Sequence, residues 1–183
     1  MNKESLLNSI FFPRPSFIDK DKYDHLVDVE KGIKVGVRFF IEDIEYPNIL
    51  FFHGNAELAQ EYNQIGKLFN QYNCNFIVSD YRGYGLSNGK PTKENLHSDS
   101  HQIFSYVKSF LEQNNHIGKL LIMGRSLGSA SACEIISKHL ENIDGCIIES
   151  GFATEYPILK MFNINPHDIK YHENDGFENL KKV

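Results

Sequence analysis

The residues with the clearest chemical potential form one Gly-x-Ser-x-Gly pattern at positions 124–128, centred on Ser126. The apolar stretch 119–123 before it predicts a strand, and the stretch 127–140, rich in small residues, predicts a helix. A tight turn between a strand and a helix holds its serine in a strained conformation and exposes the hydroxyl. The flanking positions must be small, and both are glycines. The chemistry expected of Ser126 is attack on a carbonyl to form an acyl-enzyme.

A second group of polar residues follows the predicted strand 48–52 and begins with His53. Acyl transfer needs two N–H donors directed at the developing oxyanion. In the architecture that uses such a turn, one donor belongs to the residue after the serine, Leu127, and the other to the loop after the third strand. We expect Asn55 to supply the second donor, with Ala56 as second choice. His53 is expected to hold this loop, because a catalytic base should follow the serine in the chain.

Further residues are expected to line the same site. Asp80, Tyr81 and Arg82 follow the predicted strand 76–79. Asp80 is expected to accept N–H groups from the glycine-rich loop after it, and Arg82 to pair with a carboxylate or carbonyl. Arg125, inside the serine turn, could be structural or could face a substrate.

An acid and a base are needed to activate the serine. Glu149 ends the predicted strand 145–148 and is the possible acid. His167 and His172 follow the serine in a polar stretch, and either could swing over the site as the base, although their spacing does not require it. His97 and His101 have helical i,i+4 spacing, but two histidines without a third ligand favour a solvated helix face over a metal site. No metal and no cofactor are expected for this chemistry.

The elements that must position these residues alternate between strands and helices, which predicts a mostly parallel sheet with helices on both faces. Ligands of such sheets bind at the carboxyl ends of the strands, so the polar groups above should lie close together. The predicted strands are 25–30 and 33–40 (an antiparallel pair), 48–52, 76–79, 119–123 and 145–148. The predicted helices are 57–71, 92–114 (capped by Thr92), 127–140 and 154–162. The stripe expected to be buried on helix 57–71 is Leu58, Tyr62, Ile65, Leu68 and Phe69.

Four motifs occur in an order and spacing that resemble a known superfamily: FFHGNAE (51–57), DYRGYGLSNG (80–89), GRSLGS (124–129) and ESGF (149–152). From about Leu26 to Lys182 the chain is similar to the α/β-hydrolases, in particular to small serine hydrolases of the Bem46-like and ABHD17-like branch. The resemblance implies a Ser–acid–His triad, with the acid and the histidine on two further strands. It therefore implies an α/β-hydrolase fold lacking the last two strands, with an arm at 1–24 and an incomplete domain at 25–183.

The expected function is that of a serine hydrolase of carboxylic ester, thioester or peptide-like substrates, acting through Ser126. This activity is expected to be impaired in the chain as given, because the implied acid and histidine lie beyond Val183, through natural truncation or a gene-model break. The alternative is a non-catalytic binding module, or a fragment completed by a separate C-terminal chain at an exposed sheet edge.

The composition of the chain restricts the kinds of binding partner and the cellular compartment that are expected. The net charge is −5 without a basic cluster, which excludes a nucleic-acid partner. The three cysteines, Cys74, Cys133 and Cys146, form no Cys-x-x-Cys pair, which predicts reduced thiols and a cytoplasmic protein. Cys133 and Cys146 are expected to be buried. No apolar run reaches the ~20 residues of a membrane span. Residues 1–12 are expected to pack on the domain, with membrane docking as an alternative.

Overall fold

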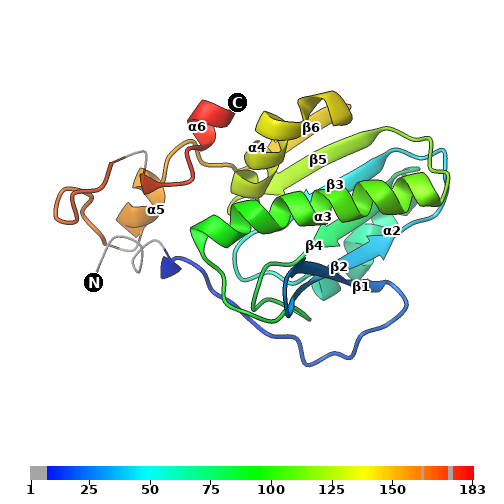
Figure 1. The fold of residues 1–183 in the computed structure, drawn as a ribbon, viewed down its shortest axis with the longest axis horizontal. Helices are drawn as coiled ribbons and strands as arrows, with labels where there is room; N and C mark the ends of the chain where they lie inside the picture. Colours follow the sequence, from blue (N-terminus) through cyan, green and yellow to red (C-terminus); the bar gives the residue numbers. More distant parts are fainter. Residues whose placement is uncertain (1–7, 162, 173–174) are drawn as a thin grey trace.

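The computed structural model describes residues 8–161, 163–172 and 175–183. Its described strands form one sheet in the order β1-β2-β4-β3-β5-β6 (Figure 1). β1 pairs with β2, and β2 with β4, in antiparallel fashion, whereas β4, β3, β5 and β6 run parallel. The strands are β1 (Asp24–Glu30), β2 (Ile33–Phe40), β3 (Asn48–Phe52), β4 (Asn75–Ser79), β5 (Leu120–Arg125) and β6 (Gly145–Glu149). The predicted strands and the antiparallel opening pair are confirmed.

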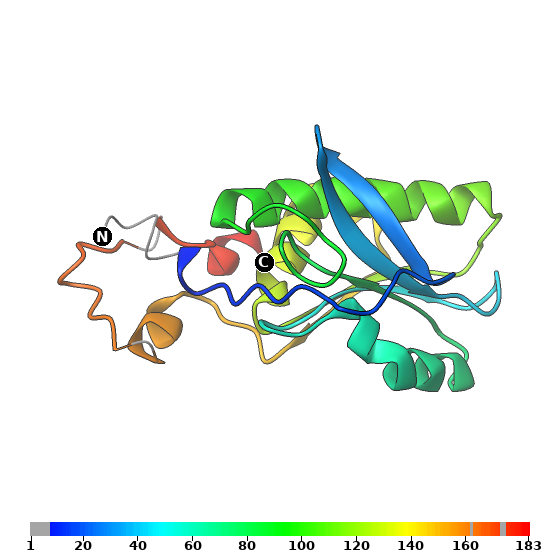
Figure 2. The same cartoon turned by 90° about the horizontal axis from the view of Figure 1, so that it is seen from below.

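Helices cover both faces of the sheet, as predicted. Figure 2 shows α3 (Lys93–Gln113) and α4 (Gly128–His139) on one face, with α2 (Asn63–Gln71) on the other. Alternate side chains of a strand point to opposite faces. On β3, Leu50 accordingly joins the core under α3 and α4, while Ile49 and Phe51 join the core under α2.

The long helix α3 follows its sequence pattern closely. The Thr92 hydroxyl accepts a hydrogen bond from the Asn95 N–H at 3.2 Å, and the Asn95 side chain accepts one from the Thr92 N–H at 2.8 Å. These reciprocal bonds satisfy two N–H groups that a helix start leaves open. The face that packs on the sheet is buried and consists of Leu96, Ile103, Phe104, Val107 and Leu111.

The predicted helix 57–71 differs from the structure in its phase. It begins as the 3₁₀ helix η1 (Ala59–Tyr62) and continues as α2. A 3₁₀ helix has 3.0 residues per turn instead of 3.6, so it rotates the faces that follow it. Ile65 and Leu68, predicted to be buried, are 40% and 49% exposed. Gly66 faces the sheet instead, so close to Phe40 that a side chain would overlap the ring.

The strand β6 lies at the edge of the described sheet and pairs only with β5. Ile147 and Ile148 are 40% and 43% exposed. Cys146 on the same strand is exposed as well, so the expectation that it is buried is wrong, whereas Cys133 on α4 is buried as expected. An apolar run predicts a strand, but it does not say whether each face of that strand is covered.

The segments after β6 and the arm before β1 lie near the carboxyl ends of the parallel strands, whereas the segment after α4 leads to their amino ends. A short 3₁₀ helix, η2 (Leu140–Asn142), follows α4, and α5 (Tyr156–Met161) and α6 (Asn179–Lys182) come after β6. Residue 162, the predicted end of the α5 segment, lies outside the described residues. The arm before β1 runs beside the glycine-rich loop, where the Ser16 N–H donates to the Gly85 carbonyl at 2.8 Å. Ile10 and Phe11 of the arm are buried. In the described part of the chain, every helix is too short or too polar to cross a membrane.

Candidate active site

The turn that carries Ser126 has the strained geometry predicted for it. Ser126 has φ +50°, the left-handed region that residues with a side chain seldom adopt. Its N–H donates to the Glu149 carbonyl at 3.0 Å, and its carbonyl accepts from the Ser129 hydroxyl at 2.6 Å. The residue is exposed, and its hydroxyl makes no hydrogen bond to any described residue. The backbone is thus fixed while the hydroxyl remains open to a ligand.

The two glycines that flank the turn allow very close packing. A side chain on Gly128 would overlap the carbonyl of Phe52 at the end of β3. A side chain on Gly124 would overlap the Gly128 carbonyl and lie 2.7 Å from the Ala132 Cβ. The expectation that both positions must be small is confirmed, and the serine turn is pressed directly against the end of β3.

Two backbone N–H groups beside this turn have no acceptor among the described residues, and they belong to Leu127 and Asn55. The N–H of Ala56, by contrast, donates to the Asn55 side-chain oxygen at 3.0 Å. Ala56 itself has φ +61°, which turns the chain sharply at this point. Of the two alternatives for the second donor, Asn55 is the one whose N–H is open.

The side chain of Asn55 makes hydrogen bonds through both its nitrogen and its oxygen. Its amide nitrogen donates to the Ile10 carbonyl at 2.6 Å, and its oxygen accepts from the Phe12 N–H at 3.0 Å and the Tyr84 hydroxyl at 2.7 Å. The residue therefore joins the loop after β3 to the arm and to the glycine-rich loop. Its backbone is thus held in place by hydrogen bonds to two distant segments.

His53 has the structural role expected of it. It is completely buried, with Nε2 3.1 Å from an Asp80 oxygen and Nδ1 2.7 Å from the Gly54 carbonyl. The Tyr81 hydroxyl donates to the His53 carbonyl at 2.6 Å. Asp80 also accepts the Ala59 N–H at 2.9 Å. It was expected to accept from the glycine-rich loop. That loop instead approaches so closely that a side chain on Gly85 would overlap the carboxylate.

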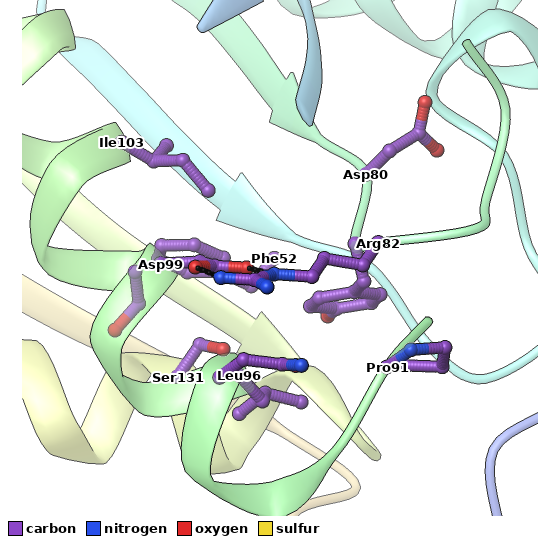
Figure 3. A pocket seen from close by; sticks show the side chains of 11 residues that line it. Phe52, Asp80, Arg82, Pro91, Leu96, Asp99, Ile103 and Ser131 are labelled. Atoms are coloured by element: carbon purple, nitrogen blue, oxygen red, sulfur yellow. Dashed lines mark hydrogen bonds and ion pairs between the residues drawn. The ribbon is translucent and has the colours of Figure 1, made fainter. Parts of the chain in front are cut away.

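Arg82 faces the helix α3. It forms a two-point ion pair with Asp99, at 2.7 Å for each hydrogen bond, and a third bond to Glu30 at 2.7 Å. The Asp99 hydrogen bonds are the main cause of its raised pKa. Figure 3 shows Arg82 directed toward Asp99, with Asp80 directed the other way. The adjoining cavity has a volume of about 10 Å³, room for about one water, so it does not hold a substrate. The expected carboxylate pairing of Arg82 is thus found.

Arg125 belongs to a network that the sequence analysis missed. Its guanidinium lies 3.1 Å from a Glu57 oxygen and hydrogen-bonds the Tyr62 hydroxyl. Burial of the guanidinium opposes ionisation, but the bond to Tyr62 and the charge of Glu57 raise the pKa of Arg125. The same Glu57 oxygen accepts the Gly54 N–H at 2.8 Å. The sequence did contain a signal for the Glu57–Gly54 contact, because an acid three residues after a backbone N–H has the spacing at which its carboxylate can reach back to that N–H.

The candidates for acid and base are not paired with Ser126 in the described part of the chain. Glu149 is half-exposed, and its carboxylate lies 3.9 Å from Arg125. His167 and His172 are exposed, and neither hydrogen-bonds the serine. The described residues thus present an exposed serine hydroxyl and two open N–H groups, and none of the histidines among them hydrogen-bonds that hydroxyl.

The helix histidines form a polar cluster that includes the C-terminal helix. The Lys182 ammonium lies 2.6 Å from Glu134 and 3.1 Å from His97 Nε2. His101 binds the other Glu134 oxygen at 3.1 Å and His139 at 2.9 Å. Burial and the Lys182 charge lower the pKa of His97 to about 4. A solvated helix face was expected here, but the side chains are partly buried and paired. No group of described side chains is arranged to hold a metal ion.

Comparison with known proteins places these features in a wider context. A family model described as "Serine aminopeptidase, S33" matches residues 46–164. The chain is 32% identical over 138 residues to human alpha/beta hydrolase domain-containing protein 17B, covering 74% of this chain and 44% of that protein. It is 30% identical over 109 residues to protein bem46 of Schizosaccharomyces pombe, covering 59% of this chain and 36% of that protein. The chain thus spans less than half the length of these relatives.

Solved structures show the same architecture. The structure titled "Ferulic Acid bound to Est1E from Butyrivibrio proteoclasticus" matches with a TM-score of 0.63 at 19% identity, over 75% of this chain and 56% of that one. At this identity the likeness concerns the fold alone. It includes the mixed sheet and the helices on both of its faces, and it confirms the fold class predicted from the sequence.

Proposed function

Because this chain belongs to the α/β-hydrolase family, in the group of the serine aminopeptidase S33 model and the Bem46-like proteins, we propose that it is a serine hydrolase of carboxylic ester, thioester or peptide-like bonds. Ser126 is the proposed nucleophile. The observation that carries this proposal is the exposed hydroxyl of a residue at φ +50°, beside the open N–H groups of Leu127 and Asn55.

The proposed reaction has two stages. The Ser126 oxygen attacks the substrate carbonyl, and the two N–H groups stabilise the charge that develops on the carbonyl oxygen. The intermediate collapses to an acyl-enzyme when the leaving group departs with a proton, and water then releases the acid. A base must accept the serine proton, and the family resemblance implies a histidine oriented by an acid. We place both on strands that pair beyond β6, with Glu149 as the alternative acid.

A fluorophosphonate probe tests the proposal directly, because it reacts covalently with activated serines. In a version of the protein that extends beyond β6, labelling should occur at Ser126 and be lost in Ser126→Ala. Ser150→Ala is the matched control, since Ser150 is exposed and also has positive φ, +48°. Its labelling should equal that of the parent chain. Labelling that survives in Ser126→Ala would show that another residue is the nucleophile.

If the present chain is not labelled, a longer version of the protein distinguishes a missing base from a wrong assignment of the nucleophile. If the present chain is not labelled but a version extended beyond β6 is, the base lies on the added strands, as proposed. If neither is labelled, the assignment of Ser126 as an activated nucleophile is wrong.

The exposed edge of β6 supports the second candidate function, a module completed by another chain. Ile147 and Ile148 are partly exposed on an edge strand, and such strands readily pair with further strands. Pairing should make the apparent mass in size-exclusion chromatography rise with concentration, and Ile148→Lys should abolish the rise. Ile117→Lys is the control, because Ile117 is 74% exposed outside the strands. A monomer at all concentrations would exclude self-pairing at this edge.

A further inference from the structure

One carboxylate oxygen joins the two loops of the candidate site. Glu57 Oε2 accepts hydrogen bonds from the Gly54 N–H at 2.8 Å, from the Tyr62 hydroxyl at 2.5 Å and from the Arg125 guanidinium at 3.1 Å. These donors come from the loop after β3, from the helix η1 and from the end of β5. The Glu57 side chain is 34% exposed, so its charge is partly shielded from water.

The positions of these donors in the chain give the contact its meaning. Gly54 immediately precedes Asn55, which holds one open N–H group. Arg125 immediately precedes Ser126, and Leu127 holds the other open N–H group. The carboxylate therefore bonds a residue that is one position before the first open donor and another that is two positions before the second. It connects the two loops through side-chain bonds that the sheet itself does not provide.

Resting on the serine-hydrolase function above, we propose that Glu57 is a positioning residue that sets the spacing between the Asn55 and Leu127 N–H groups. Oxyanion stabilisation depends on donors placed in advance at 2.7–3.1 Å from the developing charge, so a small displacement of one loop weakens it. Arg125 is then the counter-charge of this contact. That role explains why its guanidinium turns to Glu57 and Tyr62 while Ser126, the next residue, is exposed.

The charge of Glu57 is necessary for this role. A glutamine would keep the length of the side chain but offer one oxygen acceptor in place of two, with an NH₂ group facing other donors. It would also leave Arg125 without its closest carboxylate. Glu57→Asp keeps the charge on a side chain shorter by one methylene, and it should restore part of what Glu57→Gln loses.

Glu61, four residues further along in the short helix η1, provides a matched control. Like Glu57, it accepts a backbone N–H from three residues earlier, that of Leu58 at 3.2 Å. It also pairs with an arginine, but with Arg14 of the arm and not with the serine turn. Glu61→Gln removes the same chemical group at the surface without touching either open N–H group.

The first measurement is the hydrolysis of p-nitrophenyl acetate together with the rate of fluorophosphonate labelling. Glu57→Gln should lower kcat and the labelling rate roughly 10- to 100-fold, less than the loss of a whole oxyanion donor, with KM changed less than about twofold. Glu57→Asp should recover part of the loss, and Glu61→Gln should match the parent. Unchanged kcat and labelling in a folded Glu57→Gln variant would overturn the proposal.

The second measurement does not need an active protein. In ¹⁵N-resolved spectra, Glu57→Gln should shift the Asn55 and Leu127 amide signals together, whereas Glu61→Gln should shift neither. If neither the parent chain nor a version extended beyond β6 is labelled at Ser126, the hydrolase function fails by itself, and the amide signals decide the positioning role. A change confined to Gly54 and Tyr62, with Leu127 unmoved, would show that Glu57 only stabilises η1.

Discussion

At the serine turn, a strained residue is held in place by two residues that lack side chains. A non-glycine residue in the left-handed region costs of order 1–3 kcal/mol and persists only when its surroundings impose it. Here the surroundings are the Phe52 carbonyl, which touches Gly128, and the Gly128 carbonyl and Ala132, which touch Gly124. Ser126 therefore keeps its conformation because the neighbouring backbones approach closely.

Gly128→Ala should be one of the most destabilising single changes in the chain. The new methyl group would overlap the Phe52 carbonyl, and neither backbone can move without displacing β3. We expect a loss of about 3 kcal/mol or more in the free energy of unfolding, measured in urea. Gly145→Ala is the control, because its Cβ would meet only Leu121, at 3.5 Å, an ordinary contact. Equal losses in the two variants would contradict this explanation.

Sequence reasoning predicted the features that depend on local spacing. The strained turn at Ser126 follows from one short pattern, and the structural position of His53 follows from chain order. Glu57 and the Arg82–Asp99 pair were not identified because their partners come from other elements. Which carboxylate an arginine meets depends on how helices rotate and dock, and neighbouring residues do not determine that.

At the level of elements, the ion pair of Arg82 and Asp99 fastens the glycine-rich loop to α3. Both side chains are about nine-tenths buried, and the two hydrogen bonds are parallel. Removing one partner of a buried pair leaves the other charge without compensation, which typically costs about 3–5 kcal/mol.

Asp99→Asn should therefore lower the free energy of unfolding by roughly 2–4 kcal/mol, since Glu30 still offers Arg82 one carboxylate. Glu112→Gln, on the same helix, removes an exposed i,i+4 partner of Lys108 and should change stability by less than about 0.5 kcal/mol. Urea unfolding of both variants gives the comparison. A loss in Asp99→Asn as small as that in Glu112→Gln would mean that the buried pair contributes little.

The elements themselves were predictable to the extent that their faces are buried. β2 and β3 begin and end at the predicted residues because apolar runs bounded by turns define them. The phase of α2 and the exposure of Cys146 were not predictable. The first depends on a 3₁₀ turn that no residue pattern marked, and the second depends on the edge position of β6 in the sheet.

At the scale of the whole molecule, the C-terminal helix α6 is fixed to the body through ionisable groups. His97 of α3 is surrounded by Glu134 of α4, by Lys182 of α6, and by Lys93 and Glu94 of its own helix. Its pKa is lowered to about 4 from 6.5, chiefly by burial and next by Lys182. The folded protein thus favours neutral His97, which accepts a hydrogen bond from the Lys182 ammonium.

This shift predicts a specific loss of stability in acid. The unfolded chain takes up a proton at His97 below about pH 6.5, while the folded protein resists until about pH 4. The contribution of His97 is complete above pH 6.5 and falls as the pH decreases, by about 1–2 kcal/mol between pH 7 and pH 5. His97→Gln should remove this part of the pH dependence, and His167→Gln, at an exposed site, should not. If the free energy of unfolding of the parent and of His97→Gln changes with pH in parallel, the predicted contribution of His97 is wrong.

The bonds between the arm and the site have a further consequence, for the order of folding events. Phe12 hydrogen-bonds residues 43 and 72 positions later in the chain, Asn55 and Tyr84. Contacts at such separation close long loops, whose entropy must be lost before the bonds form, so they form slowly. We expect the arm to dock after the sheet has formed. In pulse-labelled hydrogen exchange during refolding, Ser16 should gain protection later than β3 and β5. The open N–H of Asn55 would then reach its final position only in the last kinetic phase of folding. The protein would therefore become compact before its candidate site is complete.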